Sequence, residues 1–297
     1  MEVFCLTLQH KNKKSMKKYL VLCLALVAVF TQTIEAQELE LPQPSPWAQV
    51  SQKFGLAQTT LTYSRPAMKG RKIFGGLVPY GEMWRTGANK ATELKIEGTV
   101  MINNQKVEAG AYSLFTIPGA TEWTIIINKN TELWGTGGYK QEEDVVRFTV
   151  TPTTTSSTES FTMSFANVKD NSVTLEMYWE TTKVSFEIKN EFVEQGKKNI
   201  EEAIAAAENT MGLYNDAAEF YLDNKLDAKL ALEWAQKSVA QKERYWNVYT
   251  LARAYAANGM YKEAVEYGTK SHTAATEAKN GGFAQTVATD LEAWKKK

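Results

Sequence analysis

Residues 172–189 read SVTLEMYWETTKVSFEIK and contain two runs in which apolar and polar side chains alternate. The apolar positions are Val173, Leu175, Met177 and Trp179 in the first run, and Val184, Phe186 and Ile188 in the second. Alternation with a period of two places the apolar side chains on one face of a strand, as in an antiparallel sheet with one buried face. The stretch therefore predicts two strands, at 172–179 and 182–189, and a core built on β-sheet.

The same alternation recurs through much of the region between residues 56 and 189. It predicts nine strands, at 56–63, 92–102, 105–107, 111–117, 122–128, 145–150, 158–168, 172–179 and 182–189. Asn103 and Asn104 predict a tight hairpin turn because asparagine tolerates positive φ. Many short strands separated by turns predict a β-sandwich of the jelly-roll or immunoglobulin-like antiparallel type over 47–190, with a Ser/Thr-rich loop at 151–160.

The chain beyond residue 190 has a different composition, with no proline and many Ala, Glu and Lys residues. Residues 231–238 read ALEWAQKS, and 33 residues later 264–271 read AVEYGTKS. This repeat resembles the tetratricopeptide repeat, whose period is about 34 residues. The sequence therefore predicts an all-α helical-repeat tail over 197–297. Such repeats bind a protein or peptide partner; the alternative is a helical cap on the sandwich or a dimer contact.

The first 36 residues have the pattern of a secretory signal peptide. Five lysines between residues 11 and 18 precede the apolar run YLVLCLALVAVF at 19–30, and small Ala36 precedes Gln37. The apolar run of 12 residues is shorter than the roughly 20 that a membrane-spanning helix requires. We expect cleavage after Ala36, a proline-rich linker at 37–46, no membrane span in the mature chain, and a periplasmic or extracellular protein.

Cleavage would leave a chain with little catalytic or metal-binding chemistry. Cys5, Cys23 and His10 would be lost, leaving His272 as the sole histidine. Of the 34 basic and 34 acidic residues, the leader takes five lysines and two glutamates, so the mature net charge is −3. This composition predicts no catalytic triad, no His/Cys metal site, no cofactor and no nucleic-acid partner. Catalysis by a pair of carboxylates remains open, because such pairs meet only in the fold.

The segment from residue 63 to 93 is rich in Arg, Gly and aromatic residues, as recognition surfaces often are. It holds three of the six arginines in the chain. We predict that an anionic or carbohydrate ligand binds the sandwich here, through Tyr63, Arg65, Arg71, Tyr80, Trp84, Arg85 and Asn89. The alternative is that these residues only hold the loop in place, with Arg85 paired to Glu82 or Glu93 and Trp84 buried.

Several motifs in this region resemble the family called domain of unknown function 2911 (DUF2911). They are Ser45-Pro46, Tyr63-x-Arg65-Pro66, Lys69-Gly70-Arg71-x-Ile73-Phe74-Gly75, Val78-Pro79-Tyr80-Gly81-x-x-Trp84-Arg85-Thr86-Gly87-Ala88-Asn89 and Ala109-Gly110-x-Tyr112-Ser113-Leu114. The resemblance covers about 45–190. It implies a secreted bacterial β-rich domain, sometimes followed by repeats, and it implies no activity.

Three functions are compatible with these observations. The first is a non-catalytic secreted binding or scaffolding protein of the bacterial envelope. The second is a carboxylate-based hydrolase that acts on envelope carbohydrate. The third is a structural component of the envelope. A shallow patch of Arg and aromatic residues would favour binding, whereas a cleft with two carboxylates roughly 5–10 Å apart would favour hydrolysis.

Overall fold

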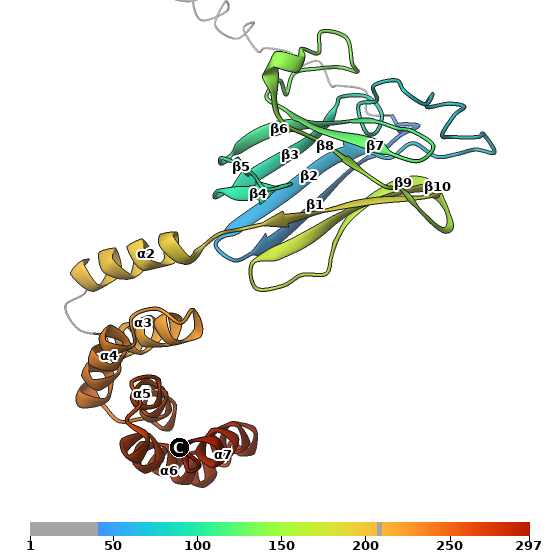
Figure 1. The fold of residues 1–297 in the computed structure, drawn as a ribbon. Helices are drawn as coiled ribbons and strands as arrows, with labels where there is room; N and C mark the ends of the chain where they lie inside the picture. The colour runs from blue at the N-terminus through green and yellow to red at the C-terminus, as the bar shows by residue number, and fades with distance from the viewer. Residues whose placement is uncertain (1–40, 207–209) are drawn as a thin grey trace, which may run out of the picture. The chain divides into compact units, whose positions relative to one another are not determined.

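A computed structural model describes residues 41–206 and 210–297 of the chain (Figure 1). The predicted signal peptide, residues 1–36, lies outside the described residues. Antiparallel sheets form the region between Trp47 and Lys189, and helices form the region from Val193 to Trp294. The two regions are described separately below.

The β-region consists of two antiparallel sheets. The first has the strand order β1-β2-β3-β6-β7-β8, and the second has the order β5-β4-β10-β9. The strands of the first sheet are β1 (Trp47–Phe54), β2 (Ala57–Ser64), β3 (Thr92–Glu97), β6 (Gly110–Ile117), β7 (Trp123–Asn128) and β8 (Asp144–Val150), which the 3-10 helix η1 (Gln141–Glu143) precedes. The strands of the second sheet are β4 (Val100–Ile102), β5 (Gln105–Val107), β9 (Thr153–Ala166) and β10 (Ser172–Lys189).

A single apolar core joins the inner faces of these two sheets, which confirms the expected β-sandwich. The inner face of the second sheet contributes the apolar positions of β10, among them Leu175 and Trp179. Leu61 of β2 and Ile125 of β7 contribute from the first sheet, and both are fully buried. The period-two pattern of residues 172–189 therefore predicted correctly which residues of β10 point inward.

The predicted strand at 92–102 is two strands that belong to different sheets. The chain leaves the first sheet after Glu97 and enters the second at Val100. Gly98 lies between them with φ +86°, and a Cβ there would stand 3.3 Å from the Cα of Ala57. Glycine permits the sharp change of direction because it adopts positive φ without steric cost. Periodicity alone does not show that a strand changes sheets.

Three further differences concern strands. β1 was not predicted, because half of its sequence WAQVSQKF is polar and its positions range mainly from exposed to half-buried. The predicted loop at 151–160 is wrong for the most part, since β9 begins at Thr153 and pairs with β10. The predicted strands at 172–179 and 182–189 form one long strand, β10, whose register with β9 shifts around Glu180. Thr-rich sequence suits an exposed strand as well as a loop.

The helical region contains α2 (Val193–Ala206), α3 (Met211–Asp223), α4 (Ala228–Gln241), α5 (Tyr245–Ala257), α6 (Tyr261–Glu277) and α7 (Gly281–Trp294). The α3–α4 and α5–α6 pairs are built alike. Each turn has a positive-φ residue, Lys225 at 53° and Gly259 at 75°. Ser238 donates to the carbonyl of Met211 at 2.8 Å, and Ser271 donates to that of Tyr245 at 2.6 Å. The repeat seen in the sequence is therefore also a repeat of helix hairpins.

Candidate functional site

Two residues of the predicted recognition loop lie in the sandwich core. The Trp84 side chain is 8% exposed and stacks on Trp179, with ring centroids 5.7 Å apart. Its indole Nε1 donates to the carbonyl of Gly87 at 3.0 Å. The Tyr63 hydroxyl accepts from the amide of Met163 at 2.8 Å and donates to the carbonyl of the same residue at 3.2 Å. These aromatic residues fix the loop to the core, and neither offers a free face to a ligand.

Three other predicted residues bind backbone or side-chain atoms of their own domain. Arg65 donates from Nε to the carbonyl of Phe161 at 3.1 Å and from Nη2 to the hydroxyl of Thr162 at 2.7 Å. Arg71 is exposed and donates to the carbonyls of Ala67 and Met68 at 2.7 and 2.9 Å. Asn89 has φ 59°, and its amide donates to Ser45 and Ser64. These contacts match the loop-anchoring alternative.

The remaining two predicted site residues, Tyr80 and Arg85, take no part in these anchoring contacts. The Tyr80 side chain is 47% exposed and lies against Gly75. Arg85 forms no ion pair within 4.0 Å in the described part of the chain, so the expected partners Glu82 and Glu93 do not hold it. Its Nε is buried without a hydrogen-bond partner. The structure therefore does not bring the seven residues together on one surface.

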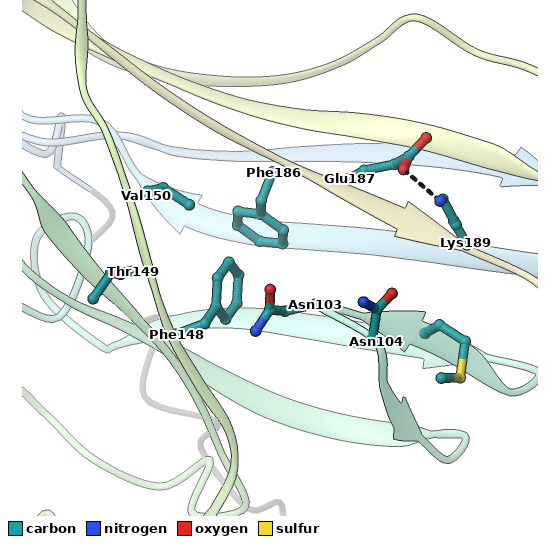
Figure 2. A pocket seen from close by; sticks show the side chains of 9 residues that line it. Asn103, Asn104, Phe148, Thr149, Val150, Phe186, Glu187 and Lys189 are labelled. Atoms are coloured by element: carbon teal, nitrogen blue, oxygen red, sulfur yellow. Dashed lines mark ion pairs between the residues drawn. The ribbon is translucent and has the colours of Figure 1, made fainter.

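A pocket of about 270 Å³ lies elsewhere on the sandwich, where β8 meets the β4–β5 turn and the end of β10 (Figure 2). Its lining residues are Met101, Asn103, Asn104, Phe148, Thr149, Val150, Phe186, Glu187 and Lys189. The rings of Phe148 and Phe186 meet edge to face with centroids 5.4 Å apart. Figure 2 shows Asn103 beside the Phe148 ring and Glu187 paired with Lys189. The pocket thus combines aromatic surface with amide and charged groups.

The turn that closes one side of this pocket presents two amide side chains. Asn103 and Asn104 have φ of 49° and 60°, which confirms the predicted tight hairpin. Within the described residues, neither side chain forms a hydrogen bond with another protein group. The asparagine pair in the sequence was sufficient to predict this turn. The approach of Phe148 and Phe186 from different sheets had no sequence signal beyond burial.

The pocket contains one carboxylate, that of Glu187. A hydrogen bond from Lys189, at 3.0 Å, is the main cause that lowers the pKa of Glu187, although partial burial opposes it. The carboxylate is therefore ionised and paired at neutral pH. Glycoside hydrolysis by the usual route needs two carboxyl groups flanking the scissile bond. A single paired carboxylate does not supply the acid and the base that this route requires.

A polar network on β7, β8 and the loop between them is closed on itself. Arg147 Nε lies 3.0 Å from Asp144 Oδ2, and the Tyr139 hydroxyl donates to the same oxygen at 2.7 Å. Asn128 donates to Asp144 Oδ1 at 2.8 Å. Burial and the hydrogen bond to Asp144 raise the pKa of Tyr139 to about 12. Each polar group here has a partner in the network, so the cluster stabilises the loop and offers no open acid or base.

A second closed cluster lies on β10. Lys183 Nζ is 2.6 Å from Glu176 Oε1, and the Tyr178 hydroxyl donates to the other oxygen of the same carboxylate. Burial opposes ionisation of Glu176, but the hydrogen bonds from Lys183 and Tyr178 outweigh it and lower the pKa. A carboxylate that is ionised and accepts two hydrogen bonds is not poised as a general acid at neutral pH. The cluster is best explained as structural.

In residues 41–206 and 210–297, no group of three or more His, Cys, Asp or Glu side chains could hold a metal ion. Within those same ranges, no helix is both long and apolar enough to cross a membrane.

The described residues therefore define a two-sheet antiparallel domain that carries a small aromatic and amide-lined pocket, followed by a helical region with repeated hairpins. Residues 45–188 match the family model described as "Protein of unknown function (DUF2911)". The sandwich domain of this chain therefore matches that family, as its loop motifs indicated. No curated protein and no solved structure matches the chain.

Proposed function

We propose that this protein is a non-catalytic binding protein exported to the bacterial envelope, and that the pocket between β8, β10 and the β4–β5 turn holds a carbohydrate ligand. The observation that carries the proposal is the convergence of Phe148 and Phe186 with the amides of Asn103 and Asn104. The predicted signal peptide supports the location. The DUF2911 match supports a β-rich domain and leaves its ligand open.

The chemistry of the pocket suits a sugar ring. A sugar has an apolar C–H face, which packs on aromatic rings, and hydroxyl groups, which both donate and accept hydrogen bonds. Each asparagine amide carries donors and an acceptor, so it can match a hydroxyl in either role. A volume of about 270 Å³ suits a small ligand. Pockets that combine apolar walls with a few placed polar groups are typical ligand sites.

The two alternatives receive less support from the described residues. A carboxylate-based hydrolase would need a second carboxyl group facing Glu187, and no other acidic residue lines the pocket. Turn chemistry alone explains the asparagine pair, but a purely structural component does not account for its convergence with Phe148 and Phe186 on one pocket. Binding therefore accounts for more of the observed geometry than either alternative does.

The proposal is tested by titrating the mature protein, residues 37–297, with sugars released from the envelope of its host and following binding by calorimetry. Asn103→Gly and Asn104→Gly are the informative variants, because glycine keeps the positive φ of the turn and removes only the amide. We expect each to weaken binding by at least about tenfold, the equivalent of roughly 1.4 kcal/mol. If both variants bind the sugar as tightly as the wild type, this pocket is not the ligand site.

Asn167→Gly is the matched control. Asn167 has φ 49°, lies in the turn between β9 and β10, and is not among the lining residues. It should leave affinity unchanged. Phe148→Leu then tests the aromatic face alone, because it keeps an apolar side chain and removes the ring.

A second function is favoured by the helical region, and we propose that its hairpins are tetratricopeptide-like and hold an extended peptide segment. Glu219 of α3 accepts from Thr250 of α5 at 2.9 Å, and Asp223 pairs with Arg253. Asn215 lies one helical turn before Glu219 on the same stripe. It is 4% exposed, and its Oδ1 has no hydrogen-bond partner. A backbone N–H from a bound peptide would satisfy that acceptor.

Selection of peptides from a displayed library against the full mature chain tests this second function. Peptides that bind should lose affinity for Asn215→Leu, which keeps the volume and removes the amide. They should bind Asn104→Gly as well as the wild type. Selected peptides that bind Asn215→Leu equally well would refute the proposal.

A further inference from the structure

Two loops of the sandwich are joined at the end of the first sheet where β7 ends and β8 begins. The amide of Ala91 donates to the carbonyl of Leu133 at 3.0 Å, and Lys90 lies 4.0 Å from Glu132. Beneath them is a small apolar cluster apart from the main core, with Ala91, Phe115 and Ile126 buried and Met83, Ile117, Leu133 and Tyr139 packed around them. The segment that contains Arg85 is thus held against the loop at 129–143.

The Arg85 side chain lies at this junction. Its Nη1 is 3.5 Å from the position that a Cβ on Gly135 would occupy, so the guanidinium lies beside the backbone of that glycine. Its Nε is buried and has no hydrogen-bond partner. A buried charged donor without an acceptor is costly, and such groups are rare in folded proteins. An acceptor supplied from outside the chain would remove this cost.

The loop beside Arg85 offers further donors. Residues 135–138 read GTGG, with φ of 102° at Gly135 and 85° at Gly138. Gly135 is buried. In the described part of the chain, the backbone amides of 135–138 donate no hydrogen bond. Successive free amides in a glycine-rich turn form a concavity suited to an anion. Trp134, directly before them, is 75% exposed.

We propose that Arg85 and the 134–138 loop form a binding site for an oxyanion, a carboxylate or phosphate group, on a ligand whose flat face covers Trp134. The guanidinium binds such a group through two parallel N–H donors. The loop amides supply further donors, and the exposed indole supplies apolar area with little entropy to lose. Of the acidic residues in and directly after this loop, Glu132 lies 4.0 Å from Lys90 and Asp144 is paired with Arg147, whereas Glu143 has a buried Oε2 without a hydrogen-bond partner.

Comparison with the other loop arginines points to Arg85 in particular. Arg65 and Arg71 lie in the same Arg-rich segment, and each donates to protein acceptors through two nitrogen atoms. Among residues 41–206 and 210–297, Arg85 donates to no protein acceptor in this way. The site is also separate from the pocket of Figure 2, because β8 runs from Asp144, paired with Asn128, to Val150, paired with Trp123. The two sites lie at opposite ends of that strand, so an experiment can refute one proposed site without refuting the other.

The test is an NMR titration of the ¹⁵N-labelled mature protein with sodium phosphate and, separately, with sodium glucuronate. Glucose and sodium chloride at matched concentration and ionic strength are the controls. We expect saturable shifts of the 135–138 amides and of the Trp134 indole with at least one of the two anions. A response to phosphate alone assigns a phosphate ligand, and a response to glucuronate alone assigns a carboxylate ligand. Equal shifts with chloride would overturn the proposal.

Variants separate this site from general electrostatics. Arg85→Gln should weaken binding of the anion at least about tenfold. Arg71→Ala, which removes another loop arginine, should leave the affinity unchanged. Trp134→Ala should weaken glucuronate more than phosphate, because only the sugar covers the ring. The dispersion of the β6 and β7 amide signals reports whether each variant is folded. Arg85→Gln that is folded and binds like the wild type would overturn the proposal.

Discussion

Replacement of Trp84 by alanine is the sharpest test of whether this residue of the 63–93 segment belongs to the core or to a recognition surface. The side chain is 8% exposed. It lies among four aromatic rings at centroid distances of 5.0–6.4 Å, namely Phe74, Trp123, Phe161 and Trp179. Removal of roughly 200 Å² of buried aromatic surface at about 25 cal/mol per Å² would cost about 5 kcal/mol as an upper figure. Measured core Trp→Ala changes cost about 3–5 kcal/mol. We therefore expect a loss of about 4 kcal/mol.

Amide hydrogen exchange of β6 and β7 is the suitable measurement, because it reports the sandwich separately from the helical region. Trp134→Ala is the matched control, since the same residue type is there 75% exposed. It should change the free energy of unfolding by no more than about 0.5 kcal/mol. If Trp84→Ala costs less than about 1 kcal/mol, or if Trp134→Ala costs as much, the assignment of Trp84 to the core is refuted.

Three further predictions follow from single features of the chain. Arg65→Ala should cost about 1.5–3 kcal/mol of unfolding free energy because it leaves two acceptors unsatisfied. Arg71 is exposed, so Arg71→Ala should cost less than about 1 kcal/mol. Equal losses of unfolding free energy in urea titrations of the two variants would contradict this. The raised pKa of Tyr139, about 12, means that the folded protein holds this phenol proton more tightly than the unfolded chain. Its contribution to stability should be complete below about pH 10 and lost as pH rises toward 12, and Tyr139→Phe should remove that part of the alkaline decline; a variant with an unchanged decline would show otherwise. Intact mass of the protein from its host should place Gln37 first after cleavage at Ala36, and a retained apolar run at 19–30 would disprove export by this leader.

The loop residues acquire structural roles for a physical reason. A long loop has many backbone carbonyls with no strand partner, and each needs a donor or water. Arginine supplies five N–H donors in a fixed fork, so it serves a loop as well as it serves a ligand. Arg71, for example, binds two carbonyls of the segment directly before it. Composition rich in Arg and Trp therefore does not by itself distinguish recognition from loop anchoring.

The sequence by itself determined the features that depend on local periodicity and turn chemistry. Alternation identified the inward positions of β10, because successive side chains of a strand point to opposite faces. The asparagine pair at 103 and 104 determined the hairpin between β4 and β5, since both residues adopt positive φ. The 33-residue repeat determined two similar helix hairpins, and the loop motifs indicated the family model that residues 45–188 match.

Only the tertiary structure decided which residues meet across the sheets and loops. Phe148 and Phe186 belong to different sheets, and Arg85 meets a glycine fifty positions further along the chain. Periodicity shows whether a side chain points inward, but it carries no information about which distant strand or loop lies opposite. The same limit explains why Trp84 is a core residue while Arg85, its neighbour in sequence, has a buried Nε without a hydrogen-bond partner among the described residues. Those pairings depend on strand order and on the turn at Gly98, which are set by packing of the whole domain.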